Sequence, residues 1–212
     1  MKIREIYERA IKTGRELDPR GRDEVSRELE RTKKDFDELK DKDKKFFDTE
    51  RLTNPYADSR VLFGDPEREV KMALVGIDME VGEVLLADRL KDRGKAIDLI
   101  IAHHPEGRGM AKLYDVMDMQ TDILHKYGVP INVAEDIMDE RIREVERRLM
   151  PANHSRAVDA ARLLDIPIMC LHTPADNCVT DYLQKLFDES KPYYVSDIVK
   201  ILKDIPEYMA SM

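Results

Sequence analysis

The sequence has 212 residues, a length that can bury the core of one domain. Its net charge of −8 argues against a general nucleic-acid binder, because neutralising phosphates requires a basic face. The longest uncharged apolar runs fall far short of the roughly 20 residues of a transmembrane helix, and the start MKIREIYERA has no apolar signal core, so we expect a cytoplasmic protein without a membrane partner. Charged residues at 38%, no Trp and only nine Gly are also typical of thermophile proteins.

Residues 1–48 are expected to form a charged helical arm. Apolar residues recur every three or four positions on both sides of DPRG at 18–21, where Pro and Gly should break the helix. Such narrow apolar stripes usually dock on a neighbour, here the main domain or another subunit. In residues 49–68, Pro, Asn, Gly and Asp interrupt every periodicity, so this segment is expected to be an irregular connector.

Residues 69–212 alternate between β-prone and helical patterns. Strands are predicted at 69–78, 96–104, 129–135 and 166–172. Helices are predicted at 80–94, 110–128, 136–150, 154–165, 176–190 and 195–205. Because the strands alternate with helices and their apolar runs are nearly continuous, we expect an α/β fold with a mainly parallel sheet covered by helices on both faces.

Polar side chains stand at the ends of all four predicted strands. In chain order they are Asp78, the pair His103 and His104, Glu135, and His172 followed by Asp176. Ligands bind outside the carboxyl ends of parallel strands, so we expect these side chains to converge in one crevice. Imidazole and carboxylate groups together suit zinc, iron(II) or manganese.

The adjacent pair His103 and His104 restricts how such a site could be built. Neighbouring side chains on a strand point to opposite faces of the sheet. The two imidazoles can therefore share one ion only if the strand has already broken into the PEGRG loop. Otherwise they serve two ions, or one ion and a structural contact.

Two further residues have competing interpretations, and a third has a single one. Asp176 follows HTP and would either cap the next helix or ligate a metal. His154 is either a surface residue or a ligand, and the second interpretation gains weight because His103, His104 and Asp176 alone leave a metal site short of ligands. His125 lies near the C-terminus of a predicted helix, where it is expected to be structural.

Motifs for other chemistries are weak or absent in the sequence. Arg108 in EGRG could orient an anionic substrate, but there is no Walker or GxGxxG pattern. There is also no GxSxG and no CxxC, and Cys178 has no obvious base partner. Nucleophilic catalysis by Ser or Cys is therefore disfavoured.

Residues 70–185 resemble a known family. MALVGIDMEVGEVLLADRL followed by AIDLIIAHHP, and later CLHTPAD, are similar to motifs of the NGG-one-interacting factor three family, also described as GTP cyclohydrolase type 2-like dinuclear metal proteins. The resemblance implies an α/β sandwich of related halves that assembles into rings, hence a homo-oligomer. It also implies a two-metal site with His103 and His104 as ligands, Asp176 as a bridging carboxylate and His172 in a supporting role.

The sequence also departs from the family pattern. The family's remaining ligands are a His and a Glu near the C-terminus, after a glycine-rich segment, and this sequence offers no such pair. It inserts two helices before IPIMCLHTPAD and carries an N-terminal arm without a counterpart, so it resembles a shortened member with an inserted helical pair. Either His154, with Glu135, replaces the lost ligands, or the site is reduced or empty.

The sequence thus predicts a divalent-metal-binding protein that acts as a metal-dependent hydrolase on a small molecule or nucleotide. The candidate ligands of one or two zinc, iron or manganese ions are His103, His104, His154 and Asp176. Glu135 and His172 are the catalytic candidates. The alternatives are a non-catalytic metal-binding scaffold or regulatory protein that assembles through its helical arm, and a relative that uses the fold only structurally.

Overall fold

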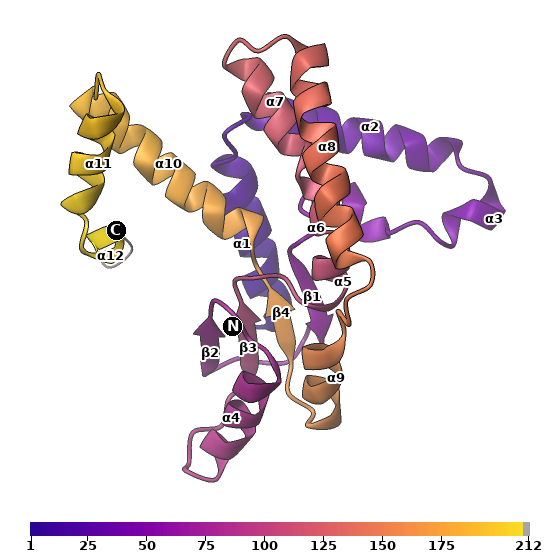
Figure 1. Ribbon diagram of the computed structural model, residues 1–212. Coiled ribbons are helices and arrows are strands. Elements are labelled where there is room, and N and C mark those ends of the chain that lie inside the picture. The colour runs from indigo at the N-terminus through magenta and orange to yellow at the C-terminus, as the bar shows by residue number, and fades with distance from the viewer. Residues whose placement is uncertain (210–212) are drawn as a thin grey trace.

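A four-stranded sheet lies at the centre of the computed structural model, which describes residues 1–209 (Figure 1). Its strands are β1 (Arg60–Phe63), β2 (Ala73–Gly76), β3 (Leu99–Ala102) and β4 (Ile168–Cys170). They lie in the order β1-β4-β3-β2. Strands β2, β3 and β4 run parallel, whereas β1 pairs antiparallel with β4 at one edge. The mainly parallel α/β sheet predicted from the sequence is confirmed.

Helices make up most of the remaining described chain. The long ones are α1 (Ile3–Glu16), α2 (Arg22–Glu38), α4 (Val81–Lys91), α8 (Ile131–Leu149) and α10 (Thr173–Ser190). The shorter ones are α3 (Asp41–Lys44), the 3-10 helix η1 (Thr49–Leu52), α5 (Gly107–Ala111), α6 (Leu113–Val116), α7 (Asp118–Lys126), α9 (Arg156–Leu163), α11 (Val195–Lys203) and α12 (Pro206–Met209). None of these helices is both long and apolar enough to cross a membrane.

Strands β3 and β4 are buried on both faces because their side chains alternate between two apolar clusters. On one face Ile100 and Ile168 pack with Val84 of α4 and Val158 of α9. On the other face Leu99 and its neighbours in the sheet pack against α1. Nearly every strand residue is therefore apolar, as in other sheets covered by helices on both sides.

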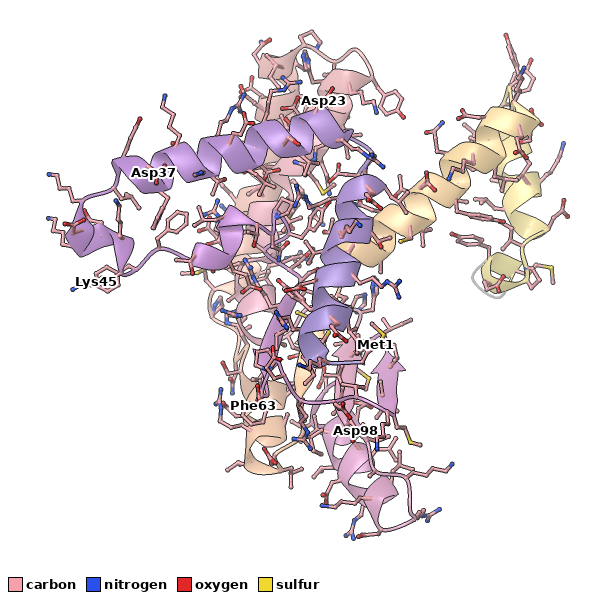
Figure 2. All side chains as sticks on the ribbon, turned by 180° about the vertical axis from the view of Figure 1, so that it is seen from behind. Met1, Asp23, Asp37, Lys45, Phe63 and Asp98 are labelled. Carbon is pink, nitrogen blue, oxygen red and sulfur yellow. The ribbon has the colours of Figure 1, made fainter. Side chains whose placement is uncertain are left out.

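Helix α1 supplies the cover on the second face of the sheet. Its Ile3 has no exposed surface and packs with Leu99 and Met169. The apolar stripe predicted for this helix therefore docks on the main body of the same chain. Helix α2 runs outward from that body, from Asp23 past Asp37 (Figure 2). Helices α10 to α12 extend away on another side (Figure 1).

Two secondary-structure predictions are wrong. Residues 129–135 are not a strand: Pro130 caps helix α8, in which Ala134 and Met138 are buried one helical turn apart. The irregular connector predicted at 49–68 contains strand β1, because its RVLF run is β-prone despite the Pro, Gly and Asp around it. In addition, the single helix predicted at 110–128 is divided into α5, α6 and α7.

Replacing Gly14 by Ala is expected to destabilise the protein and to disturb the start of α10. Gly14 is buried in α1, and an added Cβ would lie 2.8 Å from Cα of Pro174, a backbone atom in the first turn of α10. We expect the free energy of unfolding in urea to fall by about 1–3 kcal/mol, the usual cost of overpacking. Gly82→Ala is the matched control: its Cβ meets nothing within 4 Å in α4, so stability should rise by up to about 1 kcal/mol. Equal effects of the two substitutions would contradict the close α1–α10 contact.

Candidate metal centre

The three parallel strands end at the same level of the sheet. The last residues of β2, β3 and β4 are paired side by side, Gly76 with Ala102 and Ala102 with Cys170. Backbone hydrogen bonds continue past these ends, from N–H of His103 to the carbonyl of Gly76 at 2.8 Å. The polar residues that follow the strands are therefore delivered to one edge of the sheet, as the sequence predicted.

Three of these residues form a cluster that could hold a metal ion. Potential ligand atoms of His103, His172 and Asp176 all lie within 4.8 Å of one another. Asp176 Oδ1 is 3.5 Å from His103 Nε2, and Asp176 Oδ2 is 3.5 Å from His172 Nε2. Two imidazoles and a carboxylate are a donor set that suits zinc, iron(II) or manganese. We call this cluster the His103–His172–Asp176 triad.

The break of the strand explains how His103 and His104 come together. Strand β3 ends at Ala102, so the two histidines belong to a bend and are not forced to opposite faces of the sheet. Their ring centroids are 5.2 Å apart, and that of His104 is 5.8 Å from His172. His104 thus lies beside the triad without being part of it.

Asp78 holds His104 in place. It follows β2, and its Oδ1 lies 2.7 Å from Nδ1 of His104. This contact leaves Nε2 as the ring nitrogen of His104 that is available for chemistry. Both side chains are exposed, His104 at 50% and Asp78 at 71%, so solvent reaches them.

Asp176 is not the cap of helix α10. The N-cap is His172, and Asp176 lies within the first turn, its N–H bonded to the carbonyl of His172. Residues four apart share one face of a helix, so His172 and Asp176 face the same space. Of the two interpretations of Asp176, the geometry favours a ligand.

A buried carboxylate that no sequence motif marks, that of Asp58, supports the triad. Asp58 precedes β1 and accepts hydrogen bonds from the hydroxyls of Thr173 and Ser59. Ser59 Oγ in turn accepts the backbone N–H of His172 at 3.0 Å. Burial raises the pKa of Asp58, although the Thr173 hydrogen bond and the nearby imidazole of His172 oppose the shift. The turn into α10 is therefore anchored to the edge of the sheet.

One ring nitrogen of His172 lacks a hydrogen-bond partner. Its Nδ1 is buried and forms no hydrogen bond within the described residues. A buried polar atom without a partner is costly and calls for an explanation such as a bound ion or water. In the triad the ring nitrogen that faces Asp176 is Nε2, so Nδ1 is the nitrogen that would carry the proton, and it is the donor set of the triad that fits a bound metal ion.

Glu106, next to the histidine pair in HHPEG, has a perturbed acidity. Burial and the nearby carboxylates of Glu80 and Asp78 raise its pKa to about 7, while Arg156 opposes the shift. Near neutral pH this carboxyl group is therefore partly protonated. In the sequence its only signal is its place two positions after His104.

The structure does not bring His154 or Glu135 into the triad. His154 Nε2 lies 2.6 Å from the carbonyl oxygen of Leu149, within its own loop. Glu135 is exposed on α8 and borders a separate cleft together with Arg20 of the arm. The expected position of Glu135 at a strand end is wrong because its segment is helical.

Arg108 is also engaged elsewhere. Its guanidinium donates to Oε2 of Glu50 at 2.8 Å and to the carbonyl of Val61 at 3.1 Å. It therefore braces α5 against η1 and β1. The sequence-based suggestion that it orients an anionic substrate gains no support from these contacts.

Among solved structures, the chain is similar to a NIF3 superfamily protein from Sphaerobacter thermophilus, with a TM-score of 0.61 and 26% sequence identity. The fold is NIF3-like. The match covers 73% of this chain but only 56% of that one, so this chain spans just over half the length of its structural neighbour. No protein-family model and no curated protein sequence matches the chain.

The NIF3-like fold supports the resemblance seen in LIIAHHP and HTPAD. The alternating strands and helices of the sequence and the solved structure point to the same architecture. The cyclohydrolase relationship, the second metal ion and the shortening relative to the family stay predictions.

The two cysteines should differ sharply in reactivity. Cys170 is fully buried, and burial raises the pKa of its thiol to about 12, whereas Cys178 is exposed on α10. Since the thiolate is the reactive form, a disulfide reagent at pH 8 should label one thiol per native chain and two after denaturation. Rapid labelling of both thiols in the native protein would contradict the buried position of Cys170.

Proposed function

We propose that the chain binds a divalent metal ion through the His103–His172–Asp176 triad and uses it to hydrolyse a small molecule. One observation carries this proposal: His103 after β3, His172 after β4 and Asp176 in α10 come together in one cluster. The three side chains remain between 23% and 51% exposed, so a substrate can reach the ion. Three protein ligands with open positions are typical of catalytic rather than structural metal sites.

A divalent ion in this position would supply Lewis acidity, which polarises the bond to be broken and makes water a nucleophile near neutral pH. We assign the role of proton acceptor to His104. The carboxylate of Asp78 binds its Nδ1, so the imidazole is oriented and Nε2 is left to take a proton. A base held by a carboxylate in this way is a recurrent arrangement in hydrolases.

This assignment changes the roles expected from the sequence. His172 becomes a metal ligand instead of a catalytic group, and His104 becomes a proton acceptor instead of a ligand. His154 and Glu135 receive no role, because their side chains lie outside the triad. The family resemblance implies two ions, whereas the triad by itself accounts for one.

Metal stoichiometry and turnover test the proposal together. The protein is stripped with a chelator and titrated with zinc and manganese, and ester, amide and phosphoester substrates are then screened for hydrolysis. We expect about one ion per chain, and we expect His104→Ala to keep that ion while losing turnover.

Other results for metal content and turnover would change the assigned roles or overturn the proposal. Two ions per chain, one of them lost in His104→Ala, would make His104 a ligand of a second ion. Metal binding without turnover of any substrate would favour a non-catalytic scaffold. A protein that binds no metal would overturn the proposal.

A further inference from the structure

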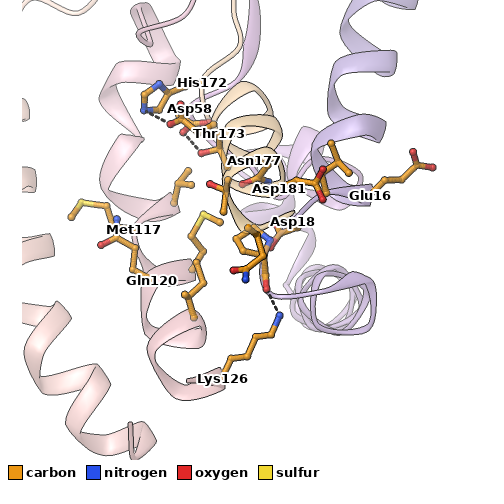
Figure 3. A pocket seen from close by; sticks show the side chains of 18 of the residues that line it. Glu16, Asp18, Asp58, Met117, Gln120, Lys126, His172, Thr173, Asn177 and Asp181 are labelled. Carbon is orange, nitrogen blue, oxygen red and sulfur yellow. Dashed lines mark hydrogen bonds and ion pairs between the residues drawn. The ribbon is translucent and has the colours of Figure 1, made fainter. Parts of the chain in front are cut away.

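A cavity of about 450 Å³ adjoins the triad, with His172 and Asp176 at its border (Figure 3). Its walls come from α10, from the end of α1 and the turn after it, and from α6 and α7. A space of this size accommodates a small organic molecule. If the triad holds the catalytic ion, the cavity is where the rest of the substrate would lie.

One wall of the cavity is apolar and adaptable. It is formed by side chains of α6, α7 and the residue between them: Leu113, Val116, Met117, Met119 and Ile123. Methionine side chains are flexible and polarisable, and they make favourable contacts with the edges and faces of aromatic rings. This wall suits a flat ring.

The opposite wall, on α10, offers hydrogen-bond acceptors. Asn177 is only 2% exposed and lines the cavity. Its Nδ2 donates to the carbonyl of Gly14 and to the hydroxyl of Tyr56, which settles the orientation of the amide. Its Oδ1 accepts no hydrogen bond from the described residues and is not sealed off from the cavity, so an acceptor is left for a ligand. Asp181, one turn further along α10, adds a carboxylate, whose Oδ2 accepts from Lys185 at 2.6 Å and whose Oδ1 remains for a ligand.

The charges that line the cavity disfavour an anion. Among the described lining residues one is basic, Lys126, and its Nζ already donates to the carbonyl of Pro19 at 2.5 Å (Figure 3). Acidic residues outnumber it at the walls, with Glu16, Asp18, Asp58 and Asp181 in addition to the triad's own, although Asp18 is paired with Arg20 and burial raises the pKa of Asp58. A phosphate placed here would lack the basic side chains that normally hold one.

Two contacts between helices tie the walls of the cavity together. Lys126 of α7 reaches the turn after α1, and Tyr127 donates to Oε1 of Gln184 on α10 at 3.2 Å. The cavity is therefore bounded by side chains that bridge separate elements, which favours a preformed binding site.

We propose that this cavity binds a neutral ring compound that carries N–H donors, and that it selects against phosphorylated compounds. The ring lies on the methionine wall, and its N–H edge faces Asn177 and Asp181. This inference rests on the proposed function and deepens it, because it narrows the substrate class of the same site from small molecules in general to uncharged ring compounds.

Methionine-methyl NMR on the metal-free protein tests the proposal. Adenosine and cytidine are compared with their 5′-monophosphates at the same millimolar concentrations, and the signals of Met117 and Met119 are assigned with the corresponding Leu variants. We expect both nucleosides to shift these two signals and the monophosphates to bind at least tenfold more weakly. Because no metal is present, the result does not depend on whether the chain binds an ion or catalyses hydrolysis.

Charge reversal at the acceptor wall gives a second measurement. Asp181→Lys should weaken nucleoside binding and bring the monophosphate affinity at least up to that of the nucleoside. Glu189→Lys makes the same charge change on α10 outside the cavity lining and should leave both affinities unchanged. The proposal is overturned if the monophosphates bind the native protein as tightly as the nucleosides. It is equally overturned if none of the four compounds shifts Met117 or Met119.

Discussion

The variant Asp176→Ala is expected to lose its metal ion. Asp176 is the one carboxylate of the triad and lies 3.5 Å from ring nitrogens of both His103 and His172. Removing a ligand should lower the affinity by more than the roughly 10–100-fold that loss of a supporting hydrogen bond costs a metal site. His172→Ala should have a similar effect. Metal content by mass spectrometry and titration of the apoprotein with cobalt, read from its absorption spectrum, measure the loss.

Glu135→Ala and His154→Ala are the controls for this experiment. Both residues are candidates from the sequence that the structure places outside the triad. They should keep the full metal content and the same cobalt spectrum as the native protein. If Asp176→Ala keeps its metal while His154→Ala loses it, the triad is the wrong site and the sequence-based ligand set is the better one.

The variant Asp18→Ala is expected to cause the largest loss of stability. The side chain of Asp18 has no exposed surface, and it binds the guanidinium of Arg20 through two contacts of 3.0 Å. It also accepts the hydroxyl hydrogen of Tyr56 at 2.8 Å. Removing it leaves Arg20, only 4% exposed, without its buried partner, and breaking such a pair costs about 3–5 kcal/mol. Urea denaturation with a constant slope measures the change in the free energy of unfolding.

A surface pair supplies the control for the stability measurement. Asp92 lies 3.4 Å from Arg89, but both side chains are mostly exposed, so Asp92→Ala should leave stability unchanged within error. The double variant Asp18→Ala, Arg20→Met should recover part of the loss, since it removes the unpaired charge as well. If Asp18→Ala costs less than about 1 kcal/mol, the remaining contact from Arg20 to Glu28 at 2.8 Å is enough to satisfy the guanidinium.

Much of the sheet and of the site could be predicted because the signals are local. The apolar runs around LIIA and IPIMC predict buried strands from neighbouring residues alone, and His103, His104 and His172 follow those runs directly. Once the strands are parallel and in register, their ends must meet at one edge. Asp78 and Asp176 also follow predicted strands closely, so the same local signal points to them.

The errors occurred where a short pattern fits two structures. VPINVAE has the β-branched residues of a strand, yet it starts α8, whose buried residues follow a helical spacing that appears only over several turns. Glu135 was therefore assigned to an edge of the sheet that it does not reach. RVLF was overlooked in the connector because a four-residue strand is hard to distinguish among breakers.

For His154 the prediction from sequence fails for a different reason. Its position after Pro151 and Asn153 says nothing about what its ring contacts, and the carbonyl of Leu149 is a partner that becomes visible only in the folded loop. Asp58 is the opposite case: an unremarkable residue in the sequence that the fold buries against Thr173 and next to His172.

By itself, the sequence determined the α/β architecture, the positions of three strands and the convergence of histidines and carboxylates at their ends. These follow from hydrophobic periodicity and strand-end chemistry, which depend on residues close together in the chain. Only the tertiary structure decided that His103, His172 and Asp176 form the triad, that Asp78 holds His104, and that a cavity lies beside them. These relations join segments that lie far apart in the chain, such as Glu16 and Gln184 at the cavity. Their distances follow from how the helices and the sheet pack, which no local pattern encodes.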